Sequence, residues 1–192
     1  MQVRSGTVSF KNRVIIFFFC ASLLIIILRP VIAYLNLWRG DQMIMTRKPG
    51  EALSQYRRAS ILAPRDPAVL SSIGYSLSKA GRHEEAAYYY RKVAQLEPRN
   101  SQNFYFLALE LLETRDYWQA AANLKKSVQI DSGNLLAWRA LAAAYKKNKD
   151  FESSIATWKE IKRIFPRLSE RADQRLSQLA KESAKKEGEE RK

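Results

Sequence analysis

The sequence has little of what metal sites and most catalytic sites need, since it contains one cysteine, Cys20, and one histidine, His83. A single cysteine excludes a disulfide within the chain, and one cysteine with one histidine cannot provide the four ligands of a Cys/His zinc site. His83 stands beside Glu84 and Glu85 between two helical patterns, and we interpret it as a solvated turn residue. No glycine-rich phosphate loop is present. We therefore expect no enzyme activity, no metal, no cofactor and no small-molecule substrate.

The longest apolar run of the chain lies near its start, at residues 14–28 (VIIFFFCASLLIIIL). As a helix this run spans about 22 Å, which is short of a hydrocarbon core of about 30 Å. Apolar residues resume after Arg29 and Pro30, and Arg29 can extend its charge to the membrane interface. We expect an uncleaved transmembrane anchor over residues 14–38. A cleaved signal peptide and a buried core helix are the alternatives.

The charges that flank this segment bear on its orientation. Residues 1–13 form a basic tail without acids, which favours a cytoplasmic N-terminus and places the rest of the chain outside the cytoplasm. Arg29, Arg39, Arg47 and Lys48 follow the apolar run and favour the opposite orientation. Because long domains cross membranes with little regard to charge, we expect a single-pass protein of a bacterial cytoplasmic membrane with its main domain outside the cytoplasm.

Three units of 34 residues follow, at residues 67–100, 101–134 and 135–168. Each unit contains two helical patterns with apolar residues at i, i+3, i+4 and i+7 spacing. Asp66 and Pro67 suit the N-cap and first turn of the first unit, and the small residues Gly74 and Ala86 allow its helices to approach closely. A helical pair of this size cannot bury its apolar face alone, so the units are expected to stack. The apolar positions of the first unit are Leu70, Ile73, Leu77, Ala86, Tyr90, Val93 and Leu96.

This pattern resembles the tetratricopeptide repeat (TPR) family, whose repeat has the same period and the same small, aromatic and proline positions. Leu70, Gly74, Tyr90 and Pro98 match the family pattern closely, and Ala108 and Ala142 keep the position of Gly74 small. The resemblance implies an all-α superhelix of about 3.5 repeats with a C-terminal capping helix. Beside the three full units we expect a degenerate unit at 39–66, a capping helix at 169–184 and a charged, frayed tail at 185–192. In the degenerate unit, the anchor helix is expected to continue and to replace the first helix.

In this family, peptide ligands lie across the concave face, which is formed by the first helix of each pair. The chaperone-tail receptors of the family clamp a terminal carboxylate with Lys, Asn and Arg side chains, whereas Ser71, Tyr75, Tyr105 and Leu109 take several of those positions here. We expect a groove that is apolar and aromatic in its middle and basic at its C-terminal end. Alternatively, the tail or cap of the chain fills this groove. The matching positions are Ser71, Tyr75, Ser78, Tyr105, Leu109, Leu112, Arg139, Ala143 and Lys146.

Two functional hypotheses remain. The first is a membrane-anchored scaffold that binds a protein or peptide partner in the groove, in the assembly of a membrane or cell-envelope complex. The second is a polyanion binder, for nucleic acid or anionic lipid, motivated by the net charge of +14. Basic residues alternate with acidic ones, and residues 101–134 have a negative net charge, so nucleic acid is the less favoured partner. The bilayer is expected to contact only the N-terminal helix.

Overall fold

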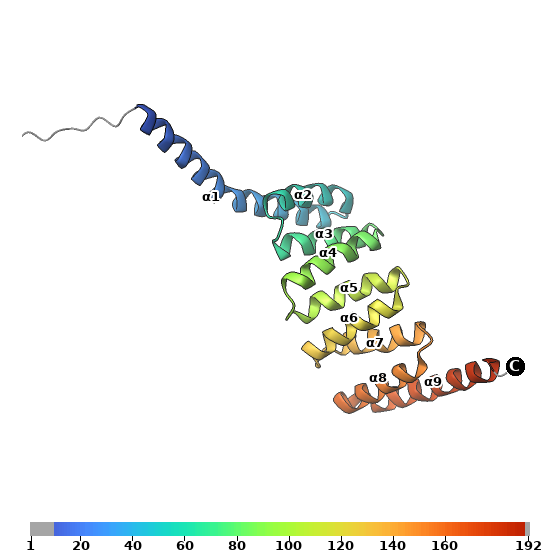
Figure 1. Ribbon diagram of the computed structural model, residues 1–192. Helices are drawn as coiled ribbons and strands as arrows, with labels where there is room; N and C mark the ends of the chain where they lie inside the picture. Colours follow the sequence, from blue (N-terminus) through green and yellow to red (C-terminus); the bar gives the residue numbers. More distant parts are fainter. Residues whose placement is uncertain (1–9, 191–192) are drawn as a thin grey trace, which may run out of the picture.

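The computed structural model describes residues 10–190 and contains, within them, helices and connecting turns but no strand. Consecutive helices pack against one another as antiparallel pairs, and the pairs stack into one elongated solenoid (Figure 1). The expected all-α fold class is therefore confirmed. The α-helices are α1 (Phe10–Met45), α2 (Pro49–Leu62), α3 (Pro67–Lys79), α4 (His83–Leu96), α5 (Ser101–Glu113), α6 (Tyr117–Ile130), α7 (Leu135–Lys147), α8 (Phe151–Ile164) and α9 (Ser169–Glu190), with a 3-10 turn at Pro166–Leu168.

Short polar side chains determine where most of these helices begin. Asp66 accepts hydrogen bonds from the backbone N–H groups of Ala68 and Val69, as its position before Pro67 predicts. Asn100, Asp116, Asn134 and Asp150 accept equivalent bonds at the starts of α5 to α8. These side chains satisfy backbone donors that have no partner within the helix. The stack therefore has sharply defined turns, which keep successive pairs in register.

Small residues set the distance between the paired helices. Gly74 of α3 is buried against α4, and a Cβ atom there would lie 3.1 Å from Cζ of Tyr90. Ala86, on the facing side of α4, is fully buried. This confirms the prediction that these two residues allow close approach.

The first helical pair is better formed than the sequence suggests. Its first helix is the second half of α1, which continues through Pro30 to Met45 and packs on α2. Ala33, Leu37 and Gly40 are buried in this half, and a side chain at Gly40 would collide with the ring of Tyr56. The expectation that the long N-terminal helix replaces the missing repeat helix is confirmed.

The first half of α1 projects away from the stack (Figure 1) and exposes its apolar side chains. It belongs to the one helix of the described residues that is long and apolar enough to cross a bilayer, by length and composition. Arg29 is exposed near the end of this half. Its Nη2 donates a hydrogen bond to the carbonyl oxygen of Ile61 at 3.0 Å, because the end of α2 leaves carbonyl groups without helical partners.

The last helix, α9, covers the apolar side of α8 with Ala172 and Leu179, which are both buried. Leu176 is only half-buried, and Ala180 is exposed. The helix continues to Glu190, past the expected end at residue 184 and into the segment expected to fray. Lys and Glu make up five of the six residues 185–190 and are good helix formers, which explains the difference.

Candidate functional site

Seven of the nine residues predicted to line the groove fall into two separate hollows toward opposite ends of the stack. Ser71, Tyr75, Ser78 and Leu109 line a hollow of about 540 Å³ between α1, α3 and α5, here named the aromatic pocket. Its other lining residues are Asp41, Ile44, Met45, Tyr56, Ser72, Lys79, Tyr90, Phe106 and Glu110.

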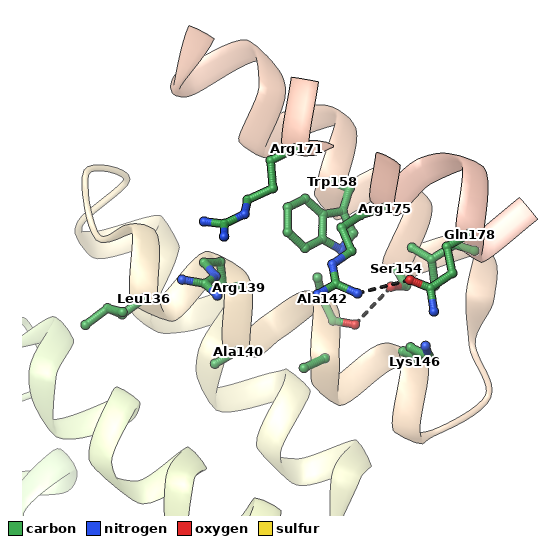
Figure 2. A pocket seen from close by; sticks show the side chains of 12 residues that line it. Leu136, Arg139, Ala140, Ala142, Lys146, Ser154, Trp158, Arg171, Arg175 and Gln178 are labelled. Carbon is green, nitrogen blue, oxygen red and sulfur yellow. Dashed lines mark hydrogen bonds between the residues drawn. The ribbon is translucent and has the colours of Figure 1, made fainter. Parts of the chain in front are cut away.

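The second hollow, here named the basic pocket, has a volume of about 500 Å³ and lies between α7, α8 and α9 (Figure 2). It is lined by the three residues predicted for the basic end of the groove, Arg139, Ala143 and Lys146. Its other lining residues are Leu136, Ala140, Ala142, Ser154, Trp158, Arg171, Arg175, Gln178 and Leu179.

Two of the nine predicted groove residues, Tyr105 and Leu112, line neither pocket. Both are half-buried and pack against the hydrophobic core instead. The exposed aromatic residue on α5 is its neighbour Phe106, whose ring centroid lies 5.6 Å from that of Tyr90. Adjacent residues on a helix point about 100° apart, so Tyr105 and Phe106 face different directions. The repeat period alone does not indicate which of the two lies on the buried face.

The floor of the aromatic pocket is formed by two tyrosines from the second helices of their pairs. Tyr56 donates a hydrogen bond to Oδ1 of Asp41 at 2.6 Å. Burial is the main cause that raises the pKa of the Tyr56 hydroxyl, and this hydrogen bond is the second. Burial also raises the pKa of Tyr90, with a smaller contribution from the nearby Glu110. Both phenols are therefore neutral at physiological pH, and the pocket presents apolar and hydrogen-bonding surface.

His83 is not the solvated turn residue that its sequence neighbours predict. Its Nδ1 lies 2.8 Å from Oε2 of Glu110, whose side chain is only 8% exposed. A buried carboxylate is costly without a partner, so this contact between α4 and α5 stabilises the wall of the aromatic pocket. Because His83 and Glu110 are 27 residues apart, local sequence patterns do not predict their contact.

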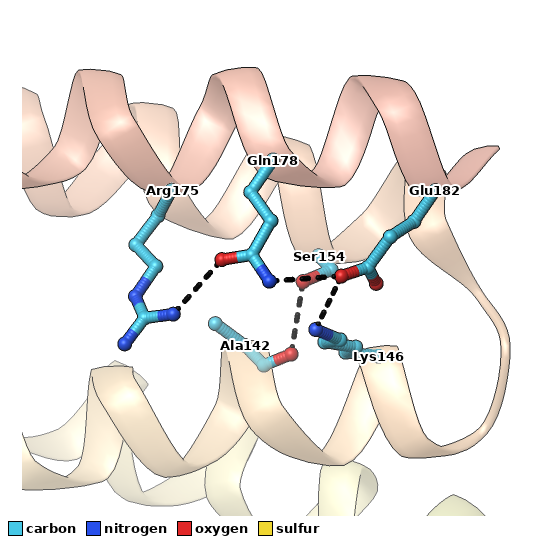
Figure 3. Close-up of polar contacts among 6 residues, drawn as sticks. All are labelled: Ala142, Lys146, Ser154, Arg175, Gln178 and Glu182. Carbon is cyan, nitrogen blue, oxygen red and sulfur yellow. Dashed lines mark hydrogen bonds and ion pairs between the residues drawn. The ribbon is translucent and has the colours of Figure 1, made fainter. Parts of the chain in front are cut away.

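One wall of the basic pocket is a chain of polar contacts that joins α9 to α7 (Figure 3). Arg175 donates to Gln178 at 3.0 Å, Gln178 donates to Glu182 at 3.0 Å, and Lys146 donates to the same oxygen of Glu182 at 2.8 Å. The bond from Lys146 is the main cause that lowers the pKa of Glu182. Lys146 and Glu182 neutralise each other, whereas the guanidinium groups remain positively charged.

Sequence reasoning missed the contribution of α9 to this pocket. Arg171 and Arg175 are four residues apart and therefore share one face of the helix. Their spacing is visible in the sequence, but the direction of that face depends on how Ala172 and Leu179 pack on α8.

The lining of the two pockets contains groups suited to non-covalent binding. Residues 11–185 contain no group of three or more His, Cys, Asp or Glu side chains that is able to hold a metal ion. The single free thiol, Cys20, is exposed on the projecting half of α1, away from both pockets. Apolar, aromatic and guanidinium groups are prominent in the lining of the two pockets.

Comparisons with known proteins agree with this architecture. The family model of the tetratricopeptide repeat matches residues 68–100, and no curated protein matches the chain. The fold is similar to that of "MamA 41-end from Desulfovibrio magneticus RS-1", with a TM-score of 0.68, 23% identity and coverage of 82% of this chain and 89% of that one.

Two further solved structures are described with a peptide or a peptide-binding site. YrrB, "a TPR protein with an unusual peptide-binding site", has a TM-score of 0.65 and 15% identity, with 77% of each chain covered. The "First TPR of Spaghetti (RPAP3) bound to HSP90 peptide SRMEEVD" has a TM-score of 0.58 and 12% identity, with 61% of this chain and 93% of that one covered. At these identities the likeness establishes the fold.

Proposed function

Because the chain is a tetratricopeptide-repeat protein, we propose that it is a membrane-anchored scaffold that holds a segment of a partner protein on the face formed by α3, α5 and α7. The observation that carries this proposal is the pair of open pockets on that face. Seven of the nine residues predicted for a groove line one pocket or the other. Peptide binding by YrrB and by the Spaghetti repeat domain supports the same kind of partner.

The membrane part of the proposal rests on the exposed first half of α1. Side chains such as Phe17, Phe18 and Ile25 are 66–69% exposed, and α1 has no packing partner there among the described residues. Exposure of so much contiguous apolar surface is unfavourable in water and favourable in a bilayer. We propose that this half spans the cytoplasmic membrane of a bacterium, with the stack outside the cytoplasm, where the partner belongs to a membrane or cell-envelope complex.

The anchor is tested by washing membranes that contain the full chain with alkaline carbonate. The protein is expected to remain in the pellet at its full length. A shortened form that begins near Tyr34 and appears in the wash would show a cleaved signal peptide instead.

The scaffold role is tested with photo-crosslinking amino acids placed one at a time at Tyr75, Arg139 and Arg91 in the full chain. Tyr75 and Arg139 line the two pockets, whereas Arg91 is exposed on α4 and lines neither. Irradiation of intact membranes is expected to join the same partner to positions 75 and 139 and nothing to position 91. Crosslinks at position 91 alone would place the binding surface on the second helices. Loss of the crosslinks when the membranes are treated with nuclease or with high salt before irradiation would favour the polyanion hypothesis.

A further inference from the structure

We propose that the basic pocket is a binding site for an acidic segment of a peptide, one in which carboxylate side chains stand beside an apolar residue. The site rests on the proposed scaffold function and specifies the chemistry of its partner. Its distinctive feature is the capping helix α9, which here provides two of the three arginines in addition to covering the end of the stack.

The charges around the pocket are not balanced by the protein itself. Arg139 of α7 and Arg171 of α9 extend toward each other across the hollow (Figure 2). Within residues 11–185 neither side chain has an ion pair or hydrogen bond, whereas Glu182 and Asp173 of α9 pair with lysines. Two guanidinium groups that face each other repel, and a carboxylate between them would convert that repulsion into two charge-assisted contacts.

The third arginine is held in place before any ligand arrives. Gln178 accepts a hydrogen bond from Nη1 of Arg175 and donates one to Glu182, which also accepts one from Lys146 (Figure 3). The remaining N–H groups of Arg175 are free to donate to a ligand, since guanidinium carries five donors. A side chain fixed in advance loses less conformational entropy on binding, which favours recognition of a carboxylate over diffuse attraction of anions.

Apolar surface beside the arginines restricts the ligand further. Leu136 is 59% exposed at the rim of the pocket, and the half-buried ring of Trp158 lies between α7 and α9. A fully hydrated anion such as free phosphate would leave this surface uncovered. A peptide with an aliphatic or aromatic residue next to its acids would cover it, and a cleft of about 500 Å³ holds a few side chains.

The test is a selection of random heptapeptides on the full chain reconstituted in nanodiscs of zwitterionic lipid. Peptides retained by the native chain are expected to be enriched in Asp and Glu next to an apolar residue. Synthetic copies of the retained acidic peptides should bind Arg139→Gln/Arg171→Gln about tenfold more weakly or worse, since two charge-assisted contacts are lost. Amide versions of the same peptides, with Asn and Gln in place of the acids, should show a similar loss on the native chain.

The matched control is Arg91→Gln/Lys159→Gln, which removes the same charge from exposed positions outside both pockets. It should bind the acidic peptides as the native chain does, and thermal unfolding should show all variants folded. Retained peptides without acid enrichment, or equal binding by both double variants, would overturn this inference. If peptides without acid enrichment bound the native chain but not Tyr75→Ala, the scaffold function would stand. A selection that retains no peptide would contradict both the scaffold function and the acidic-peptide site. A single-stranded oligonucleotide that displaces the peptides and binds both double variants equally would show a generic polyanion surface instead.

Discussion

The two ends of the stack are closed by helices of opposite chemistry. At the N-terminal end, α1 covers α2 with Ala33, Leu37 and Gly40 and continues as an exposed apolar helix. At the C-terminal end, α9 covers α8 with Ala172 and Leu179 and is otherwise strongly charged. Repeat stacks need such terminal helices because the last pair otherwise exposes its apolar side.

Each terminal helix also forms a wall of the nearer pocket. The α1 helix gives Asp41, Ile44 and Met45 to the aromatic pocket, and α9 gives Arg171 and Arg175 to the basic pocket. The comparison shows that the elements that complete the fold also determine the chemistry at each end of the groove. The predictions below separate these two roles.

The largest effect is expected from Gly40→Leu at the N-terminal end. The new side chain would collide with the ring of Tyr56, which is fully buried and bonded to Asp41, so the helices must separate. We expect a loss of about 3 kcal/mol in the free energy of unfolding, or about 6–12 °C in melting temperature. Circular dichroism of the full chain in detergent measures this change. Gly50→Leu is the control, because a Cβ atom there has nothing within 4 Å. Equal melting temperatures for both variants would disprove the close packing at Gly40.

At the C-terminal end, Leu179→Asp is expected to detach α9. The side chain is only 3% exposed, so the substitution buries a charge without a partner or forces the helix to leave, at a cost of about 2–3 kcal/mol. Hydrogen exchange should show loss of protection in α9 while α3 to α6 stay protected. Leu176→Asp should have a smaller effect because that residue is half-buried, and Ala180→Asp should have almost none. Equal loss of protection in all three variants would contradict the orientation of α9 described above.

The next prediction separates binding from folding within the groove. Tyr75 is 43% exposed in the aromatic pocket, so Tyr75→Ala should weaken peptide binding by about 1–2 kcal/mol and leave the melting temperature unchanged. Tyr105→Ala should do the reverse, because Tyr105 packs on the core. Fluorescence anisotropy with selected peptides, together with thermal unfolding of each variant, measures both quantities. A Tyr105→Ala variant that loses binding at full stability would show that Tyr105 contacts the peptide and is not needed for folding.

The smallest expected effect is a pH dependence of the C-terminal end. The pKa of Glu182 is lowered in the folded chain, chiefly by the hydrogen bond from Lys146, so the bond stabilises α9 above the ordinary value of 4.5. This contribution is lost as the pH falls below that value toward the folded pKa. The protection factors of the α9 amides, which correct for the slower intrinsic exchange in acid, should therefore fall slightly on acidification, and Glu182→Gln should remove that step. An identical pH profile in the native chain and in Glu182→Gln would show that the contact does not contribute to the attachment of α9.

The repeated helical pairs were predictable because their determinants are local and periodic. The 34-residue period and the small and aromatic positions, such as Gly74 and Tyr90, identify both helices of each pair and their buried faces. The first pair is harder to recognise because Asn36 and Arg39 occupy positions that are apolar in the other units. Gly40 nevertheless precedes Ala52 and Tyr56 at the same spacing as Gly74 precedes Ala86 and Tyr90. Asn36 is buried after all, with its amide donating to the carbonyl oxygen of Ile32 at 2.9 Å.

The pockets were predictable only in part, because their walls combine elements that are distant in sequence. Periodicity placed Tyr75 and Arg139 on the correct side of their helices. It did not indicate that α9 turns Arg171 and Arg175 toward Arg139, since this depends on the rotation of the capping helix. The contact of His83 with Glu110 likewise depends on how α4 and α5 pack together.

Because α1 is one continuous helix, the whole stack is rigidly attached to its exposed half. No flexible linker separates the exposed half of the helix from the half that packs on α2, and the bond from Arg29 to Ile61 braces the joint. Whatever surrounds residues 14–32 therefore also sets the direction in which both pockets face. One residue inserted between Ile32 and Ala33 would turn the stack by about 100° around the axis of α1 and move it outward by about 1.5 Å, with every contact inside the stack preserved.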